Sequence, residues 1–268
     1  MLDANRYVGT HDILFITLDA LRYDVARDEL AAGRTPTLAG LLPGGRWEER
    51  HSPGSFTYSA HAAFFAGFLP TPVRPGKPER LFALRFPGSE TTGRHTYLFD
   101  APDIVTGLRG VGYYSICVGG VGFFNKQTPL GCVFPNMFDE SHWRPELGVA
   151  DPSSMPNQVR TALAAVEPVP LSRRLLLFLN VSAIHQPNRF YLSGAGEDSI
   201  ATHAAALRHV DQYLARLFAR LRRRGAWFCI VCSDHGTAYG EDGHHGHRVA
   251  HPVVWTVPYA EFVLEAHA

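Results

Sequence analysis

Four short, largely apolar runs restrict the fold of this 268-residue chain more than any other feature of its sequence. Their length and their content of branched and aromatic residues are typical of strands buried on both faces. Segments with helical periodicity or many turn residues lie between them, and strands alternating with helices predict an α/β fold with a mostly parallel central sheet flanked by helices. We expect one domain covering residues 1–268. The runs span residues 13–18, 112–119, 175–181 and 227–232.

Polar residues follow the ends of two of these runs. Asp19 follows the first, whereas Asp234 and His235 follow the last. Thr57 stands at the start of an Ala- and Phe-rich segment that predicts a short buried helix. Each of these residues has a simpler explanation, as a helix cap or a loop residue. Together they offer carboxylate, hydroxyl and imidazole ligands at the carboxyl edge of one sheet, which predicts a site for a divalent metal.

Other segments are less informative. Residues 70–95 are rich in Pro and Gly and predict a long surface excursion, and residues 120–148 resemble a loop. Apolar residues at positions 207, 210, 214, 217 and 221 predict a helix with one buried face. On that helix, Asp211 lies one turn from Arg208, which favours an ion pair between them.

Charge and composition exclude several classes of partner. Lys plus Arg and Asp plus Glu both number 25, so no global field attracts nucleic acid or an anionic membrane. The polar N-terminus and the short apolar run behind it lack the pattern of a signal peptide or a membrane span, so we expect a cytoplasmic protein. Few cysteines, mostly in apolar runs, agree with a reducing compartment. The oligomeric state stays open.

Four segments, in order, resemble those of sulfatase-like enzymes in the alkaline phosphatase superfamily. The opening strand and its D-x-x-R-x-D segment read ILFITLDALRYD, and the nucleophile segment reads PGSFTYSAHAAFFAGFLP. The Asp-His-Gly metal motif reads VCSDHGTAYGEDG, and the late histidine stretch reads GHHGHRVAHPVVWTVPY. The resemblance runs from about residue 11 to 264, and the combination is more specific than any single motif. It implies an alkaline-phosphatase-like fold in which Thr57 is the nucleophile and also contacts a metal held by Asp19, Asp234 and His235.

The identity of the nucleophile separates the chemistries of this superfamily. Sulfatases oxidise a Cys or Ser to formylglycine, and threonine cannot yield that aldehyde. Thr57 resembles instead the nucleophile of phosphodiesterases, phosphonate hydrolases and phosphoethanolamine transferases. The resemblance therefore implies hydrolysis of a small-molecule phosphate ester, phosphodiester or phosphonate through a phosphothreonine. Transfer to an acceptor other than water is the nearest alternative; sulfate ester hydrolysis and an inactive metal-binding protein are weaker ones.

The same resemblance assigns two histidines and the number of metals. His185 and His247 correspond to histidines near the transferred group, where they would act in catalysis. Two-metal members carry an acidic residue four positions before the first of these histidines, and Val181 occupies that position here. We therefore expect one divalent metal, zinc first, with manganese, magnesium or calcium as alternatives.

Two further residues are predicted to bind the substrate anion. His61 stands where sulfatases place an arginine near the nucleophile; otherwise it would cap the short helix. Gly119 and Gly120 stand where those enzymes carry a Gly-Lys pair, so Lys126 in the following loop is the candidate to replace the missing lysine.

Overall fold

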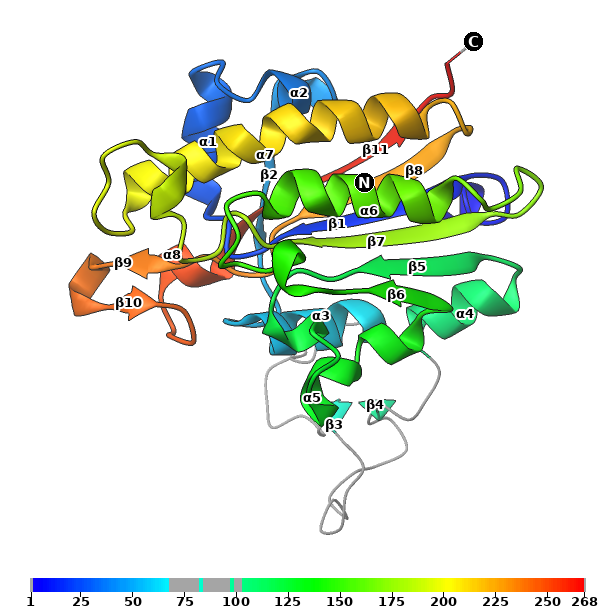
Figure 1. The fold of residues 1–268 in the computed structure, drawn as a ribbon, viewed down its shortest axis with the longest axis horizontal. Coiled ribbons are helices and arrows are strands. Elements are labelled where there is room, and N and C mark those ends of the chain that lie inside the picture. Colours follow the sequence, from blue (N-terminus) through cyan, green and yellow to red (C-terminus); the bar gives the residue numbers. More distant parts are fainter. Residues whose placement is uncertain (1, 68–81, 84–96, 99–102, 268) are drawn as a thin grey trace.

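A computed structural model of the chain describes residues 2–67, 82–83, 97–98 and 103–267 (Figure 1). The excursion predicted for residues 70–95 lies outside the described residues except for β3 (Phe82–Ala83), which pairs in parallel with β4 (Tyr97–Leu98). In the described part of the chain, no helix has the length and apolar content needed to cross a membrane.

A seven-stranded sheet forms the centre of the molecule, in the order β2-β11-β8-β1-β7-β5-β6. β1 pairs in parallel with β7 and β8, and β5 pairs in parallel with β7 and β6. β11 runs antiparallel to both of its neighbours, β8 and β2. The predicted mostly parallel sheet is confirmed, and the four apolar runs form β1, β5, β7 and β8. The strands are β1 (Asp12–Leu18), β2 (Glu48–His51), β5 (Tyr114–Val118), β6 (Glu140–His142), β7 (Leu175–Val181), β8 (Trp227–Cys232) and β11 (Thr256–Leu264).

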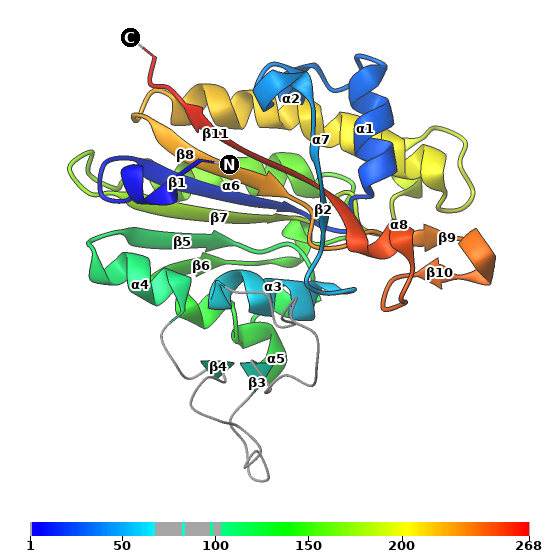
Figure 2. The ribbon, with the colours of Figure 1, turned by 180° about the vertical axis from the view of Figure 1, so that it is seen from behind.

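Helices cover both faces of this sheet (Figures 1 and 2). One face carries α1 (Tyr23–Ala31), α2 (Pro36–Ala39), α6 (Ser154–Val166) and α7 (Ile200–Leu221); the other carries α3 (Thr57–Ala66), α4 (Ile104–Gly110) and α5 (Pro129–Cys132). The short α8 (Pro252–Trp255) leads into β11, and the hairpin of β9 (Ala238–Tyr239) and β10 (His245–Gly246) projects beyond one end of the sheet.

Strand β1 shows why its sequence is continuously apolar. Leu14 and Ile16 belong to the core beneath α6 and α7, whereas Ile13 and Phe15 contact a second, Phe-rich core beneath α3 and α4. Since successive side chains of a strand point to opposite faces, a sheet covered on both sides needs apolar residues at every position.

The prediction that residues 120–148 form a loop is wrong. That segment contains α5, three 3₁₀ turns and β6, which pairs with β5 at the edge of the sheet. β6 carries Glu140, Ser141 and His142, all half-buried. An edge strand is hydrogen-bonded on one side only and does not need an apolar pattern, so this strand leaves no signal in the sequence.

The helix predicted around residues 207–221 is confirmed as part of α7, but the ion pair predicted on it is wrong. Asp211 accepts hydrogen bonds from the backbone N–H groups of Thr37 (3.0 Å) and Leu38 (2.8 Å) at the start of α2. Arg208 pairs with Glu29 of α1 at 3.0 Å. A spacing rule considers one helix at a time, whereas the free N–H groups of a neighbouring helix terminus are a better partner for a buried carboxylate.

Candidate metal centre and active site

Asp19 lies at the carboxyl end of β1, in the middle of the sheet. Its backbone N–H donates to the carbonyl oxygen of Val181 on β7 at 3.1 Å. The next residue, Ala20, is buried and has a positive φ of 64°, a conformation that alanine rarely adopts. This turn directs the Ala20 N–H to Asp234 Oδ1 at 3.1 Å. The strained backbone therefore joins the ends of β1 and β8, as is common at functional sites.

Asp234 and His235 follow β8, the parallel neighbour of β1. His235 Nδ1 lies 2.8 Å from the carbonyl oxygen of Gly236. A carbonyl oxygen only accepts, so Nδ1 carries the proton and Nε2 carries the lone pair. Gly236 has no space for a side chain, because a Cβ would lie 2.0 Å from the carbonyl oxygen of Val253. The Asp-His-Gly sequence thus fixes both the tautomer and the direction of the imidazole.

Thr57 is the first residue of α3 and is buried. Its Oγ1 lies 3.5 Å from Asp19 Oδ2 and 3.3 Å from His235 Nε2. The residue before it, Phe56, occupies the cap position without a side-chain cap. Thr57 therefore points its hydroxyl into the cluster instead of capping the helix.

Carboxylate oxygens and an imidazole nitrogen with a lone pair face one another in this cluster, and there are too few N–H or O–H donors to form hydrogen bonds with all of them. Asp19 Oδ1 and Asp234 Oδ2 are buried and have no hydrogen-bond donor, and the lone pair of His235 Nε2 lies 3.8 Å and 3.5 Å from them. Burial raises the pKa of Asp19 to about 6, with repulsion from Asp234 as the next cause, and burial raises the pKa of Asp234 to about 6. Burial lowers the pKa of His235. Such an arrangement fits a divalent cation, which would supply the missing positive charge.

His185 and His247, the two histidines to which the sequence resemblance assigned a catalytic role, lie beside the cluster. The His247 ring stacks on His235 with centroids 4.7 Å apart, and it contacts His185 edge-on at 5.4 Å. Both are half-buried. Burial, then the neighbouring His235 and His185, lower the pKa of His247 to about 3, so this imidazole is neutral. The structure therefore brings together three histidines, one from the loop after β7, one from the end of β8 and one from the segment after β10.

The two predicted anion-binding residues lie in different surroundings. His61 is fully buried, with Nδ1 2.8 Å from the carbonyl oxygen of Thr57 and Nε2 3.1 Å from Thr17 Oγ1. Because both ring nitrogens are engaged, the structure disfavours a direct contact between His61 and a substrate. Lys126 is exposed and donates to Ser141 Oγ at 2.9 Å, so its described contacts lie with β6 and do not reach the cluster.

No protein-family model matches the sequence, and no curated protein matches it at a significant level. Solved structures do match. The periplasmic domain of phosphoethanolamine transferase EptC from Campylobacter jejuni gives a TM-score of 0.63 at 13% identity, over 97% of this chain and 81% of that one. The periplasmic domain of EcEptC from Escherichia coli, in a complex with zinc, gives 0.62 at 12% identity, over 95% and 74%. A protein of the alkaline phosphatase superfamily from Vibrio parahaemolyticus gives 0.57 at 17% identity, over 96% and 61%.

The chain has the alkaline-phosphatase-like fold. Identities this low define the fold and not the activity. The chain covers 81%, 74% and 61% of the lengths of these three proteins. The fold expected from the sequence motifs is confirmed.

Val181 occupies the position where two-metal members of the superfamily are expected to carry an acidic ligand. Val181 is fully buried at the end of β7. Among the described residues, one group of three or more His, Cys, Asp or Glu side chains is close enough to share an ion, namely Asp19, Asp234 and His235. The number of metals stays a prediction.

A layer of polar side chains beneath the cluster was not predicted from the sequence. Asn180 on β7 donates through Nδ2 to Asp19 Oδ2 at 2.9 Å and to Thr17 Oγ1 at 3.2 Å. Its Oδ1 accepts from the backbone N–H of Val121 at 3.0 Å. The Thr17 hydroxyl in turn can donate to His61, which holds Thr57. The sequence signal for this layer was the presence of one polar residue, Thr17 or Asn180, inside each of two apolar runs, because a buried polar group needs a hydrogen-bond partner.

A second unpredicted set anchors the hairpin that precedes His247. Arg22 is buried and pairs with Asp24 at 2.6 Å and with Glu241 of the hairpin. Tyr239 receives hydrogen bonds from Asn188 Nδ2 at 2.9 Å and from His203 Nδ1 at 3.0 Å. These contacts tie β9 to the loop after β7 and to α7.

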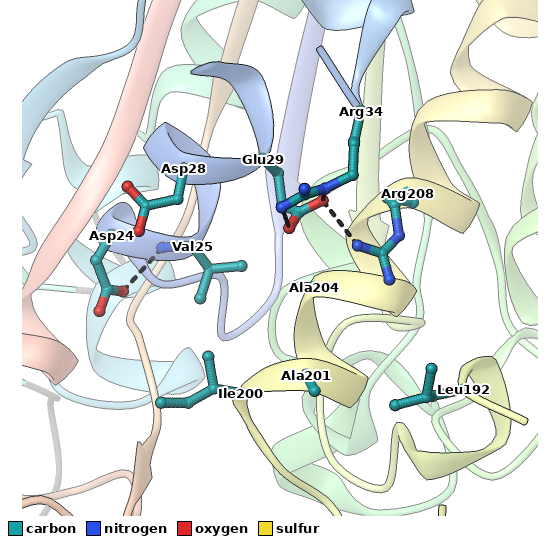
Figure 3. Close-up of a pocket in the computed structure, with 10 residues that line it drawn as sticks. All are labelled: Asp24, Val25, Asp28, Glu29, Arg34, Leu192, Ile200, Ala201, Ala204 and Arg208. Carbon is teal, nitrogen blue, oxygen red and sulfur yellow. Dashed lines mark hydrogen bonds and ion pairs between the residues drawn. The ribbon is translucent and has the colours of Figure 1, made fainter. Parts of the chain in front are cut away.

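A groove of about 620 Å³ between α1 and α7 is separate from the cluster (Figure 3). Its acidic residues are all paired: Glu29 with Arg34 at 2.6 Å and with Arg208 at 3.0 Å, and Asp24 and Asp28 with arginines outside the groove. No residue of the metal cluster lines it. The groove therefore offers no reactive group to a ligand.

Proposed function

We propose that this chain is a metal-dependent hydrolase of a phosphate ester, phosphodiester or phosphonate, with Thr57 as the nucleophile. The observation that carries the proposal is the position of Thr57 Oγ1, 3.3 Å from His235 Nε2 and 3.5 Å from Asp19 Oδ2, beside two carboxylate oxygens that lack donors. A hydroxyl at a hydrogen-bonded position in a buried, acceptor-rich cluster is suited to lose its proton once a cation is bound.

The ion would be held by Asp19, Asp234, His235 and the Thr57 oxygen. We favour zinc, because an imidazole with two carboxylates suits it and because the similar EcEptC domain is a zinc complex. A divalent cation there would favour deprotonation of the hydroxyl and stabilise negative charge on the phosphoryl oxygens.

The residues of the chain divide the remaining work. Thr57 Oγ1 forms a bond to phosphorus as the bond to the leaving oxygen breaks, which produces a phosphothreonine. The start of α3 directs backbone N–H groups toward the incoming anion. His185 donates through Nδ1 to the carbonyl oxygen of Gln186, so its Nε2 remains for proton transfer to the leaving group or from the water that cleaves the phosphothreonine. His247 is placed to assist the same transfers.

Transfer of the group to an acceptor other than water is the second candidate. The fold similarity to a phosphoethanolamine transferase favours it. An acceptor alcohol that accelerates turnover and appears in the product would identify this activity. Sulfate ester hydrolysis is disfavoured because Thr57 cannot form the formylglycine aldehyde that sulfatases use. The cytoplasmic location remains a prediction.

Substitutions at Thr57 test the proposal. Thr57→Ala should abolish turnover on a panel of phosphoesters and phosphonates while zinc content and folding persist, and Thr57→Ser should retain part of the rate. Thr10→Ala, at an exposed threonine, is the control. Acid quench during turnover should trap a phosphorylated peptide covering residues 51–67. A wild-type rate in Thr57→Ala would make water the nucleophile, and stoichiometric metal without any turnover would favour an inactive metal-binding protein.

A further inference from the structure

Arg248 is held against the segment that carries the proposed nucleophile. Its backbone N–H donates to the carbonyl oxygen of Ser55 at 2.8 Å, and its guanidinium lies over the Phe56 ring, 5.4 Å from the ring centroid. Ser55 and Phe56 directly precede Thr57 in the chain. The main chain and the side chain of Arg248 therefore both contact the two residues that precede Thr57.

The backbone of Arg248 is itself unusual. Its φ of 68° lies in the left-handed region, which a long side chain seldom occupies. His247, the preceding residue, stacks on His235 with centroids 4.7 Å apart. A strained residue that follows a group packed on the metal cluster is typical of a position where side-chain direction matters for function.

The charges around the cluster leave a role for this arginine. One divalent cation balances Asp19 and Asp234 but leaves nothing to balance an anionic substrate. Two other cations are already engaged: Arg22 is buried and paired with two carboxylates, and Lys126 donates to Ser141 on β6. Arg248 is exposed and has no carboxylate partner in the described part of the chain.

We propose that Arg248 determines specificity by binding the second negative charge of a dianionic phosphoryl group. This proposal rests on the proposed function. The planar guanidinium offers paired N–H donors that match two phosphate oxygens, and stacking on Phe56 fixes the plane of those donors. A phosphate monoester would gain this contact in full, whereas a diester, with one charge fewer, would gain less. The substrate class is therefore phosphate monoesters or other dianionic phosphoryl compounds.

The test measures binding of inorganic phosphate to the zinc-loaded protein by calorimetry at pH 8, where phosphate is mostly a dianion. Dimethyl phosphate, a monoanion, is the comparison ligand. Arg248→Gln should weaken phosphate binding roughly 10- to 100-fold, the range for charge-assisted hydrogen bonds, and dimethyl phosphate binding far less. Arg248→Lys, which keeps the charge without the planar fork, should recover part of the affinity.

Arg173→Gln is the matched control, because Arg173 is also exposed and lies 4.8 Å over the ring of Tyr114, at the amino end of β5. It should bind both ligands like the wild type, and all variants should retain zinc. Unchanged phosphate affinity in Arg248→Gln, or an equal loss for both ligands, would overturn the proposal. Phosphate binding that depends on Arg248 in a protein without turnover would refute the proposed hydrolase while supporting this assignment; turnover with Arg248-independent phosphate binding would do the reverse.

Discussion

Asp234 uses one carboxylate oxygen for structure and leaves the other for an ion. Oδ1 accepts from the N–H groups of Ala20 (3.1 Å) and His235 (3.0 Å), whereas Oδ2 has no donor and faces the His235 lone pair at 3.5 Å. Asparagine in this position would keep the accepting oxygen and place an N–H group opposite that lone pair. Asp234→Asn therefore removes a metal ligand and also removes the repulsion between Oδ2 and the His235 lone pair. Metal content reports the first effect, and the stability of the metal-free protein reports the second.

Asp234→Asn should lose the metal yet stabilise the metal-free protein at neutral pH. Burial raises the pKa of Asp234 from its ordinary value to about 6, so the folded state binds the proton more tightly than the unfolded state. Metal-free wild type therefore loses stability as pH rises from about 4 to about 6, whereas the asparagine variant loses less, because only Asp19 then remains as a buried carboxyl with a raised pKa. Above pH 6 the variant should be more stable by roughly 1–3 kcal/mol, and the difference should vanish below pH 4.

Urea unfolding of both proteins after chelation, across this pH range, measures the effect. Asp12→Asn is the opposite control: Asp12 is also buried but pairs with Arg224 at 2.9 Å, so its substitution should destabilise the protein. A metal-free Asp234→Asn protein that is less stable than wild type at pH 7 would show that the carboxylate is needed for folding and not for the ion.

The proposed metal ligands and nucleophile could be predicted from sequence motifs, whereas the residues that hold them in place could not. Asp19, Thr57, Asp234 and His235 lie in short motifs, and the structure brings them within contact distance. Asn180, which fixes Asp19, lies in no motif, and its partners come from a neighbouring strand and a loop. The family position of His61 suggested a substrate contact, but only the packed structure shows that both of its nitrogens are already bonded.

At the scale of elements, the hairpin of β9 and β10 decides where His247 lies. It begins four residues after Asp234 and carries few apolar residues, so the core does not hold it. The hydroxyl of Tyr239, bonded to Asn188 and His203, provides an anchor, as does the ion pair of Arg22 with Glu241. Positioning of His247 should therefore depend on polar contacts distant from the reacting group.

Tyr239→Phe should lower turnover roughly 10- to 100-fold without loss of metal, because small displacements of a catalytic group have effects of this size. Hydrogen exchange of residues 238–247 should become faster in the variant. Tyr259→Phe is the control, since its hydroxyl bonds to Glu261 at 2.7 Å on β11, away from the hairpin. An unchanged rate together with faster exchange would show that His247 needs no fixed position.

Elements were predictable where burial leaves a pattern. β1, β5, β7 and β8 are buried at nearly every position and appear as apolar runs. β2 and β6, at the two edges of the sheet, carry mostly charged or polar residues, so composition alone does not separate them from loops. The order of strands, which brings Asp19 beside Asp234, depends on crossover connections that no local pattern contains.

On the scale of the whole molecule, one ion would join three parts of the chain that are distant in sequence. Asp19 follows β1, Thr57 begins α3, and Asp234 and His235 follow β8. An ion that binds the folded chain and not the unfolded one stabilises the fold by mass action, by about 4 kcal/mol at a free concentration 1,000 times its Kd. For a domain of this size that corresponds to a rise of roughly 10 °C in Tm.

This stabilisation should depend on pH. Metal binding requires both carboxylates without protons, and each has a pKa of about 6 in the metal-free fold. The difference in Tm between zinc-loaded and chelated protein should therefore be large at pH 8 and small at pH 5, as protons displace the ion. Thermal unfolding with and without chelator at both pH values measures it, and Asp234→Asn should show no difference at either. Equal stabilisation at pH 5 and pH 8, or a zinc effect that survives in Asp234→Asn, would place the ion elsewhere, for example among the exposed histidines His244 and His245.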